Sequence, residues 1–534
     1  MKLPHVPIYA SRRSPVLARN VVATSQPLAA EAGIAALRRG GNAVDAALAA
    51  AITLTVVEPT GNGLGSDAFA ILWDGNRLHG LNASGRSPRA WTPDRFAHRE
   101  AMPATGWESV TVPGAVSAWV ALSERFGRLP FADLLSDAIR YAEDGFLVSP
   151  IIGALWARGA SMLSGEPGFA AHFMPGGQAP KAGETFASPD LARSLRLIAE
   201  SRGEAFYRGE LAERMARFAA DNGAALTLYD LAAHEADWPG TIHQGFAGRE
   251  GAVDLHEIPP NGQGIAALMA LGILEHCGIE RFAPDSADAL HLQIEAMKLA
   301  FRDVSAFVAD APHMTDPSTS DLLAPSYLKA RAALIDQDRA IDFQSGAPKA
   351  GGTVYLSAAD EAGMMVSFIQ SNYAGFGSGV VVPGTGISLQ NRGAGFSLRP
   401  DHPNRVGPGK RPFHTIIPGF LMREGVPVAS FGVMGGPMQA QGHLQMTLRT
   451  QVWDQDPQTA IDAPRWRVIE GLAVAVEPAI GEKVLADLSA RGHELSLEPP
   501  EASFGFGGAQ FVAKIPGGYV AGSDPRKDGA AVGF

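Results

Sequence analysis

The order in which helical and strand-like segments follow one another constrains the fold of this chain more than any other feature. Helical periodicity dominates much of the first two thirds and returns near the C-terminus, whereas the strand-like runs TVYLSAAD, MMVSFIQS, VPVASFGVM and AQFVAKI all follow residue 352. The main helical stretches are 115–145, 188–240, 287–310, 438–462 and 481–491. Strands between two groups of helices predict an α+β protein with layers of helix, sheet, sheet and helix.

Charge, cysteine content and motif spacing exclude several classes of function. The 534 residues carry a formal net charge of −11, which argues against nucleic acid or an anionic membrane as a partner, because a basic patch supplies the affinity for both. The one cysteine, Cys277, cannot form an internal disulfide or a cysteine metal site. The histidines lack HxH or HExxH spacing, and the turn GNGLGSDAF lacks the GK[ST] of a phosphate loop. The sequence therefore predicts no metal and no cofactor.

Two segments of the chain indicate its cellular location. The first twenty residues contain prolines and charges in place of the continuous apolar core of a signal peptide. The apolar run 43–57 is too short to span a bilayer, and Asp45 interrupts it. We therefore expect a soluble, cytoplasmic protein.

The stretch GGTVYLSAAD at 351–360 places two glycines directly before Thr353. One interpretation is a turn that leads into a strand. The other is a self-cleavage site, because an N-terminal threonine can use its own α-amine, with a pKa of about 7.7–8.0, as the base for its hydroxyl. Gly352 suits such a site, since glycine accepts unusual backbone dihedrals and leaves the scissile carbonyl accessible. The segment 311–352 is rich in Pro, Ser, Asp and Ala, and its last nine residues, QSGAPKAGG, have little periodicity. We therefore expect it to be exposed and mobile.

Motifs spread over nearly the whole chain resemble those of one family, in the same order. They are GGNAVDAALAAAITLTVVEPTGNGLGSDAFAILWDG, VPGAVSAW, PPNGQGI, EAMKLAFRD, GFGSGVVVPGTGISLQN, GKRPFHTIIP, VMGGP, APRW and SDPRKDGAAVG. With them the sequence is similar to the γ-glutamyltransferase (γ-glutamyltranspeptidase) family of N-terminal-nucleophile hydrolases. The resemblance implies a four-layer αββα fold and an inactive precursor that cleaves itself between Gly352 and Thr353. The large subunit would comprise residues 1–352 and the small, catalytic subunit residues 353–534.

The resemblance also implies catalytic roles for four residues. Thr353 opens TVYLSAADEAG, the motif that begins with the family nucleophile. Ser371 in FIQSNY falls where the family places a hydroxyl near the nucleophile's amine. Gly435 and Gly436 match the glycine pair whose backbone N–H groups form the oxyanion hole, where they stabilise charge that develops on the carbonyl oxygen.

A second group of residues is implied in substrate binding. Arg86 in NASGRSP matches the arginine that grips the substrate α-carboxylate, a task that suits a planar, permanently charged guanidinium. Two family serines that contact the same carboxylate are replaced here by His414 and Thr415, both of which can donate a hydrogen bond.

Several positions depart from the γ-glutamyl pattern. Val354 and Tyr355 follow the nucleophile where many members carry threonine and histidine. The Gln and the acidic residue that hold the substrate α-ammonium correspond to Arg392 and Gly395, and the asparagine that shares this task corresponds to Tyr373. A pocket that loses a carboxylate and gains a guanidinium should repel a cation and accept a neutral or anionic group.

These residues leave several acyl donors open. A γ-glutamyl compound such as glutathione is one, a small amide-bearing acid of the oxamate type is another, and a glutaryl-type cephalosporin is a third. Arg392 and Gly395 favour the latter two. A non-processed binding homologue without catalytic activity is the alternative from a different class. We expect the partners to be a small substrate with a carboxylate and the second cleaved subunit in an αβ heterodimer, with further pairing left open.

Overall fold

The computed structural model describes residues 3–6, 13–314, 316–344, 346, 352–499 and 504–534, and two antiparallel sheets form its frame. In spatial order, the seven-stranded sheet contains β1 (Val16–Ala18), β19 (Gly518–Ser523), β18 (Ala509–Ile515), β14 (Val426–Val433), β13 (Gly419–Arg423), β8 (Gly251–Glu257) and β7 (Ile242–Gly248). The six-stranded sheet contains β20 (Ala530–Gly533), β2 (Val21–Thr24), β9 (Gly352–Ala359), β10 (Met365–Tyr373), β3 (Asp67–Trp73) and β4 (Leu78–Asn82).

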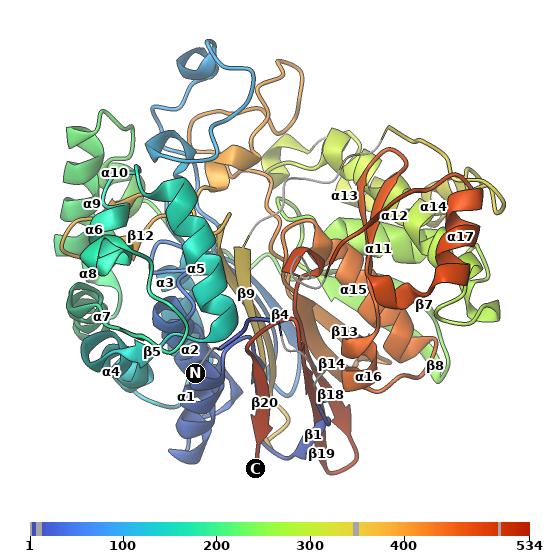
Figure 1. The fold of residues 1–534 in the computed structure, drawn as a ribbon, viewed down its shortest axis with the longest axis horizontal. Helices are drawn as coiled ribbons and strands as arrows, with labels where there is room; N and C mark the ends of the chain where they lie inside the picture. Colours follow the sequence, from blue (N-terminus) through green and yellow to red (C-terminus); the bar gives the residue numbers. More distant parts are fainter. Residues whose placement is uncertain (1–2, 7–12, 315, 345, 347–351, 500–503) are drawn as a thin grey trace.

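Helices cover the outer face of each sheet, so the molecule has four layers (Figure 1). The layer beside the six-stranded sheet contains α1 (Pro27–Arg38), α2 (Ala43–Val57), α3 (Ala115–Phe126), α4 (Ser136–Asp144), α5 (Pro150–Leu163), α6 (Phe169–Phe173), α7 (Pro189–Ser201), α8 (Glu204–Tyr207), α9 (Glu210–Asp221) and α10 (Leu228–Ala232). The layer beside the seven-stranded sheet contains α11 (Gly264–Leu274), α12 (Ala287–Phe307), α13 (Thr319–Leu322), α14 (Pro325–Ala332), α15 (Met438–Gln451), α16 (Pro457–Asp462) and α17 (Glu482–Ala490). The predicted αββα arrangement is confirmed.

Short strands complete the two helical layers. A small sheet of β15 (Trp466–Glu470), β16 (Ala473–Val476) and β17 (Glu494–Leu497) joins the second layer. The pairs β5 (Phe146–Leu147) with β6 (Thr185–Phe186) and β11 (Val381–Val382) with β12 (Ile387–Ser388) join the first.

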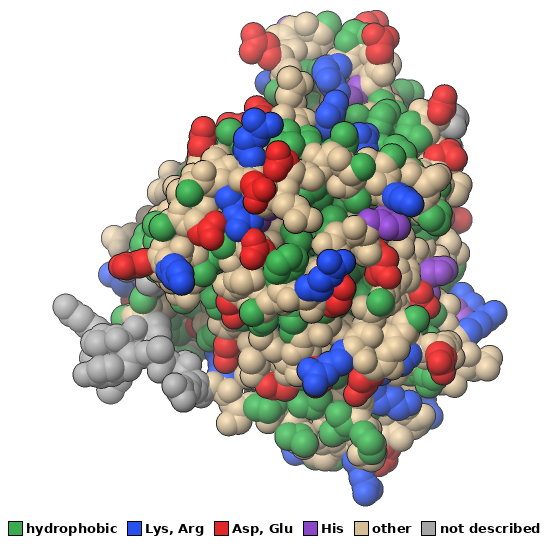
Figure 2. Space-filling view, turned by 90° about the vertical axis from the view of Figure 1, so that its right-hand side faces the viewer, with side chains coloured by type: hydrophobic (Ala, Val, Ile, Leu, Met, Phe, Trp, Pro, Cys, Tyr) green, Lys and Arg blue, Asp and Glu red, His purple; other side chains and the backbone are tan. Residues whose placement is uncertain are grey.

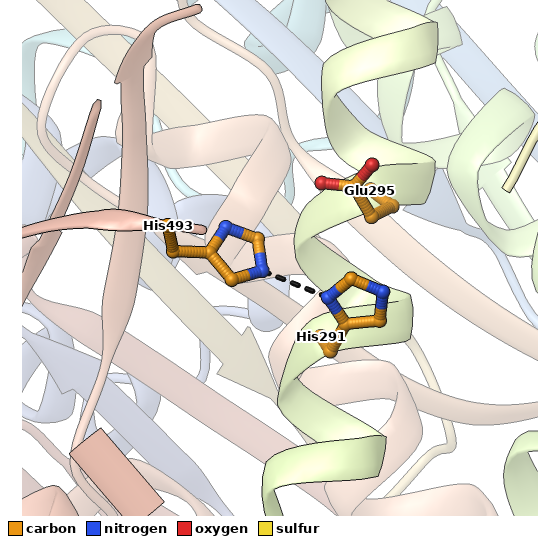
Figure 3. A group of neighbouring side chains, drawn as sticks. All are labelled: His291, Glu295 and His493. Atoms are coloured by element: carbon orange, nitrogen blue, oxygen red, sulfur yellow. Dashed lines mark hydrogen bonds between the residues drawn. The ribbon is translucent and has the colours of Figure 1, made fainter. Parts of the chain in front are cut away.

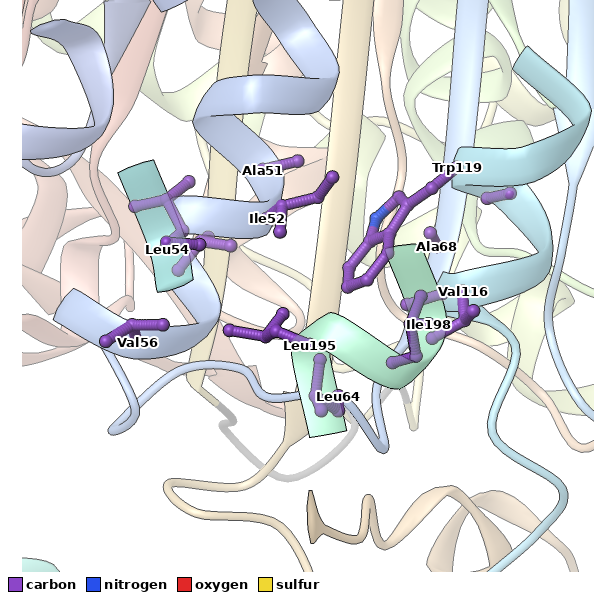
Figure 4. Packing of buried hydrophobic residues seen from close by; sticks show 14 of the residues in the cluster. Ala51, Ile52, Leu54, Val56, Leu64, Ala68, Val116, Trp119, Leu195 and Ile198 are labelled. Atoms are coloured by element: carbon purple, nitrogen blue, oxygen red, sulfur yellow. The ribbon is translucent and has the colours of Figure 1, made fainter. Parts of the chain in front are cut away.

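Helix α2 is the centre of the first helical layer. It begins at a capping box, in which the Asn42 side chain accepts hydrogen bonds from the N–H groups of Val44 and Asp45, and the Asp45 carboxylate accepts one from the Asn42 N–H. Every residue of α2 is buried, as expected for a helix that is apolar on all sides. Its side chains pack with Trp119 of α3 and Leu195 of α7 (Figure 4).

The two sheets meet through side chains that alternate along β9. Tyr355 points between the sheets, where its ring lies against Gly432 of β14, and a Cβ at Gly432 would come within 2.4 Å of that ring. The Tyr355 hydroxyl forms a 2.7 Å hydrogen bond with Ser367 on β10. Val354 points the other way, into the core beneath α2. Both departures at the start of this strand are therefore core residues, and Tyr355 sets the spacing between the sheets.

The second helical layer includes part of a segment that the sequence predicts to be exposed and mobile. Helices α13 and α14 form within 311–352, and Leu322 and Leu328 are buried in the core of this layer. That prediction was wrong for these helices, because each contributes too few apolar residues to produce a period. Residues 345 and 347–351 lie outside the described part of the chain.

The outer surface of this layer carries interspersed charges of both signs (Figure 2). Ion pairs on its helices include Arg491 with Asp288 and Asp487. Across the described residues, none of the helices has the length and apolar character needed to cross a bilayer, and the cytoplasmic location stays a prediction.

Candidate active site

Thr353 lies at the start of β9, in the middle of the six-stranded sheet. It is the second residue of the strand and is 2% exposed. On the neighbouring strand β10, the pairing with β9 shifts register between Gln370 and Tyr373. Such an irregularity re-aims side chains, and it leaves Ser371 beside the first residues of β9.

A chain of hydrogen bonds joins the Thr353 hydroxyl to the peptide carbonyl before it. Thr353 Oγ1 donates to Ser371 Oγ at 3.2 Å, and Ser371 Oγ donates to the carbonyl oxygen of Gly352 at 2.7 Å. Ser371 Oγ also accepts the backbone N–H of Tyr373 at 2.8 Å. One donor and two acceptor positions of the serine hydroxyl are thereby filled, which fixes its rotamer. The structure thus brings Gly352, Thr353 and Ser371 together at one buried point.

Gln439, a residue that the sequence does not single out, reaches the same hydroxyl. Its Nε2 donates to Thr353 Oγ1 at 3.3 Å from the first turn of α15. Gln439 lies 86 residues from Thr353, in the stretch 438–462 that the sequence predicts only to be helical. All of the described α15 residues from Met438 to Arg449 are in fact buried.

Gly435 and Gly436 form a turn just before α15, in backbone conformations that suit glycine. Their φ angles are 114° and 62°, in the region that favours glycine. Their carbonyl groups accept the N–H groups of Met438 and Gln439, both at 3.2 Å. Within the described residues neither glycine N–H donates a hydrogen bond, so both amides remain available for an oxygen ligand.

Gln263, just before α11, ties this glycine turn to the segment that carries Thr415. Its Nε2 donates to the carbonyl oxygens of Gly436 at 2.8 Å and Thr415 at 2.5 Å. Gln263 belongs to the PPNGQGI motif, but only its contacts reveal this bridging role. The oxyanion candidates and Thr415 are therefore held in fixed relation.

Arg392 carries a buried guanidinium group, and not all of its N–H donors have a hydrogen-bond partner in the described part of the chain. Its side chain is 1% exposed, Nη1 donates to Thr415 Oγ1 at 2.9 Å, and the group stacks over the Tyr373 ring at 4.8 Å. Within the described residues, Nε and Nη2 have no hydrogen-bond partner. Burial lowers the pKa of Arg392 to about 10, so the group is still cationic near neutral pH. The Asp67 carboxylate stabilises this charge from nearby, but the two donor atoms without a hydrogen-bond partner still favour an anionic ligand.

The backbone of Tyr373 supports this arrangement. Its φ is 77°, an uncommon value for an aromatic residue that costs of the order of 1–3 kcal/mol. Burial raises the pKa of its hydroxyl. Its ring is held against Arg392 by this strained turn at the end of β10.

His414 is paired with Asp67, a residue that no sequence motif singles out. His414 Nε2 lies 3.0 Å from Asp67 Oδ2, and both side chains are fully buried. Burial, together with the charges of Arg392 and Arg411, lowers the pKa of His414 well below its usual value, so the ring is neutral. Burial raises the pKa of Asp67 to about 7. Asp67 lies opposite Ser371 across β3 and β10, which places the pair beside the nucleophile.

Arg86 lies apart from these residues. Its side chain is 44% exposed and pairs with Asp310 at 3.1 Å, and Nη1 also donates to the Gly409 carbonyl at 3.3 Å. In the described structure Arg86 makes no hydrogen bond to any other residue predicted for the site. Its role in carboxylate binding stays a prediction.

The position of Gly395 has no room for a side chain. A Cβ there would lie 2.5 Å from the carbonyl oxygen of Phe413. The acidic residue found here in γ-glutamyl-specific relatives would therefore require a shift of the neighbouring backbone.

Among the described residues, one group has the composition of a metal site. His291, Glu295 and His493 offer ligand atoms within 4.8 Å of one another (Figure 3). The Lys298 ammonium already contacts the Glu295 carboxylate at 2.7 Å in full burial, and His291 Nδ1 is bonded to His493 Nε2 at 2.8 Å. A metal would have to displace a buried cation, so this donor set fits a divalent ion poorly.

With this geometry in view, comparison with known proteins decides the family. The family model described as gamma-glutamyltranspeptidase matches residues 29–534. The chain belongs to the gamma-glutamyltranspeptidase family.

Relatives within the gamma-glutamyltranspeptidase family match the chain over nearly its full length. The glutathione hydrolase-like YwrD proenzyme of Bacillus subtilis is 36% identical over 532 residues, which cover 98% of this chain and 100% of that protein. The oxamate amidohydrolase proenzyme of Klebsiella pneumoniae is 36% identical over 524 residues, covering 95% and 97%. The crystal structure of a cephalosporin acylase from Bacillus halodurans superposes with a TM-score of 0.95 at 45% identity, covering 100% of this chain and 99% of that one.

As a member of the gamma-glutamyltranspeptidase family, the chain is an enzyme of the amidohydrolase and acyltransferase class. The family, the enzyme class and the fold predicted from the sequence are confirmed. The division into residues 1–352 and 353–534 and the individual roles of the site residues stay predictions.

Proposed function

We propose that the chain cleaves itself between Gly352 and Thr353 and that the freed Thr353 is the nucleophile of an amidohydrolase acting on the amide of a small carboxylic acid. The observation that carries the proposal is the buried hydrogen-bonded chain of Thr353, Ser371 and the Gly352 carbonyl. The proenzyme names of the relatives support it.

Self-cleavage follows from that chain. Thr353 Oγ1 attacks the carbonyl carbon of Gly352 while its proton moves toward Ser371 Oγ, and Ser371 donates toward the carbonyl oxygen on which charge develops. The bond to the Thr353 nitrogen breaks, the nitrogen takes a proton, and an ester links Gly352 to Oγ1. Water then hydrolyses the ester, which leaves a Gly352 carboxylate and a free α-amine on Thr353.

Turnover uses the new amine as the base. The neutral α-amine takes the proton of Oγ1 as the oxygen attacks the substrate amide carbon. The N–H groups of Gly435 and Gly436 stabilise the oxyanion of the tetrahedral intermediate. The leaving amine departs with the proton, and the acyl-enzyme passes its acyl group to water, or to an amine in the transferase version of the reaction.

The substrate class follows from the charge of the pocket. The free donors of Arg392 would bind the substrate carboxylate, Thr415 would orient the guanidinium, and the strained Tyr373 would support it from the other side. His414 is assigned a positioning role through Asp67. A cationic pocket disfavours the α-ammonium of a γ-glutamyl compound, so a short acid amide of the oxamate type or a glutaryl amide fits better.

Arg86 and subunit association are the other parts of the proposal. Arg86 would reach the outer end of a longer substrate from its surface position beside Asp310.

The two cleaved chains would remain together as an αβ heterodimer, because β9 of the small subunit lies between β2 of the large subunit and β10.

The test compares release of product from oxamate, a glutaryl amide and γ-glutamyl-p-nitroanilide by the wild type and Thr353→Ala. We expect the wild type to prefer the substrates without an α-amine and Thr353→Ala to be inactive on all three. Activity that survives in Thr353→Ala would remove Thr353 as the nucleophile. No activity in the wild type on any amide would favour a binding homologue.

A further inference from the structure

Gln439 is placed on the reacting atom of the proposed nucleophile by contacts at both ends of its amide. Its Nε2 donates to Thr353 Oγ1 at 3.3 Å, and its Oε1 accepts the backbone N–H of Ile417 at 3.0 Å. The side chain is fully buried. Because a backbone N–H can only donate, Oε1 must face Ile417, and the NH2 group must face Thr353.

The hydrogen-bonding arrangement at Oγ1 assigns a definite task to this donor. The hydroxyl hydrogen of Thr353 points to Ser371, so the Gln439 N–H meets a lone pair of Oγ1. A donor on that lone pair stabilises negative charge as the hydroxyl proton leaves, and it fixes the direction from which the oxygen attacks. The contact is made in a fully buried site, where such a hydrogen bond has a larger effect than in water.

We propose that Gln439 is a catalytic residue that stabilises the developing alkoxide of Thr353 during both self-cleavage and turnover. This inference rests on the proposed role of Thr353 as nucleophile. It differs from the oxyanion hole, since Gly435 and Gly436 stabilise the oxygen of the attacked carbonyl whereas Gln439 stabilises the attacking oxygen.

Two substitutions separate this role from simple packing. Gln439→Glu keeps an acceptor for the Ile417 N–H, and once its buried carboxyl ionises it places an acceptor instead of a donor against Oγ1. Gln439→Met keeps the approximate volume and removes both hydrogen bonds. The matched control is Gln441→Met, because Gln441 is an equally buried glutamine of α15 whose amide bonds to Pro437 and Val468 and does not contact Thr353.

The experiment follows self-cleavage of the full-length chain after cell-free synthesis, on denaturing gels between pH 6 and 9, together with the melting temperature of each purified variant. We expect Gln439→Met to cleave roughly tenfold to a hundredfold more slowly, with its pH profile displaced to higher pH. Gln439→Glu should cleave progressively more slowly than the wild type as rising pH ionises the introduced carboxyl. Gln441→Met should cleave at the wild-type rate, although its melting temperature falls.

The inference would be overturned if both Gln439 variants cleaved with the rate and the pH profile of the wild type. It would also be overturned if Gln441→Met cleaved as slowly as the Gln439 variants. Thr353→Ala separates this result from failure of the proposed function. If Thr353→Ala is not cleaved while the Gln439 variants behave as the wild type, only the role of Gln439 is rejected. If Thr353→Ala is cleaved normally, both are rejected.

Discussion

At the residue scale, the proposed chemistry depends on a few buried polar groups whose partners come from distant parts of the chain. Ser371 links the Thr353 hydroxyl to the Gly352 carbonyl, and Arg392 is held by Thr415 with two donors left for a ligand. A buried donor without a partner is costly unless a ligand satisfies it. The proposed substrate preference therefore rests on the donors of Arg392 that lack a partner among the described residues, and the cation of Arg392 is also stabilised by the nearby Asp67 carboxylate.

The role of Arg392 predicts a specific kinetic loss. Arg392→Gln should lower kcat/KM for oxamate-type or glutaryl amides by about tenfold to a hundredfold, since a charged hydrogen bond to the substrate is lost. The uncharged methyl ester of the same substrate serves as the control, and its turnover should change little. Strong γ-glutamyl turnover in the wild type that disappears in Arg392→Gln would contradict the assigned substrate class.

The crowding at Gly395 predicts that the family's acidic residue cannot simply be restored. Gly395→Asp should destabilise the protein by about 1–3 kcal/mol, because its Cβ would press on the Phe413 carbonyl. Gly407→Ala is the matched control, since Gly407 has open space around its Cβ position. Thermal unfolding of both variants measures the difference, and a Gly395→Asp protein as stable as the control would show that the backbone yields easily.

At the scale of the elements, the site is built where β9, β10 and β3 run side by side and where α15 begins. The sequence predicts the layered fold, because hydrophobic periodicity shows the order in which helical and strand-like segments follow one another. It also predicts the closeness of Thr353 and Ser371 through family motifs. It does not predict the roles of Asp67 or Gln439. Asp67 is separated from its partner His414 by 347 positions in the sequence, and Gln439 is separated from Thr353 by 86, so neither contact leaves a local pattern. Helices α13 and α14 were missed because each buries too few apolar residues.

The contact between β9 and β14 predicts the effect of widening the gap between the sheets. Gly432→Ala should destabilise the protein by about 1–3 kcal/mol, because the new methyl group would overlap the Tyr355 ring. Since Tyr355 lies two residues from Thr353 on β9, self-cleavage should also slow. Gly407→Ala again provides the control, and measurement of melting temperature and cleavage rate checks both effects. Unchanged values for Gly432→Ala would show that the sheets separate without cost.

At the scale of the whole molecule, the two proposed subunits share one frame. Strand β9 of the small subunit pairs with β2 of the large subunit. His493 of the small subunit forms a hydrogen bond with His291 of the large subunit. Figure 3 shows these two rings facing each other between α12 and the segment after α17. Cleavage would therefore leave the two chains interlocked through both sheets and through buried side-chain contacts.

The buried histidine contact predicts a dependence of stability on pH. Burial, reinforced by the charges of Lys298 and Arg491, lowers the pKa of His493 to about 3. The unfolded chain, with a histidine pKa of about 6.5, binds the proton first as pH falls, so stability decreases from about pH 6.5 toward pH 3. At pH 5 this residue alone should cost about 2 kcal/mol.

The variant His493→Gln isolates that contribution, because an amide does not titrate and can still donate to His291. Its melting temperature should fall less than that of the wild type between pH 7.5 and pH 5. An equal fall in both proteins would show that other groups carry the acid sensitivity.

The most direct test of the central claim is the intact mass of the freshly purified protein, with sequencing of any new N-terminus. Self-cleavage predicts two polypeptides, one ending at Gly352 and one that begins with Thr353, and a single uncut species in Thr353→Ala. A wild-type protein that stays a single species of 56.0 kDa, or a cut at any other bond, would contradict it.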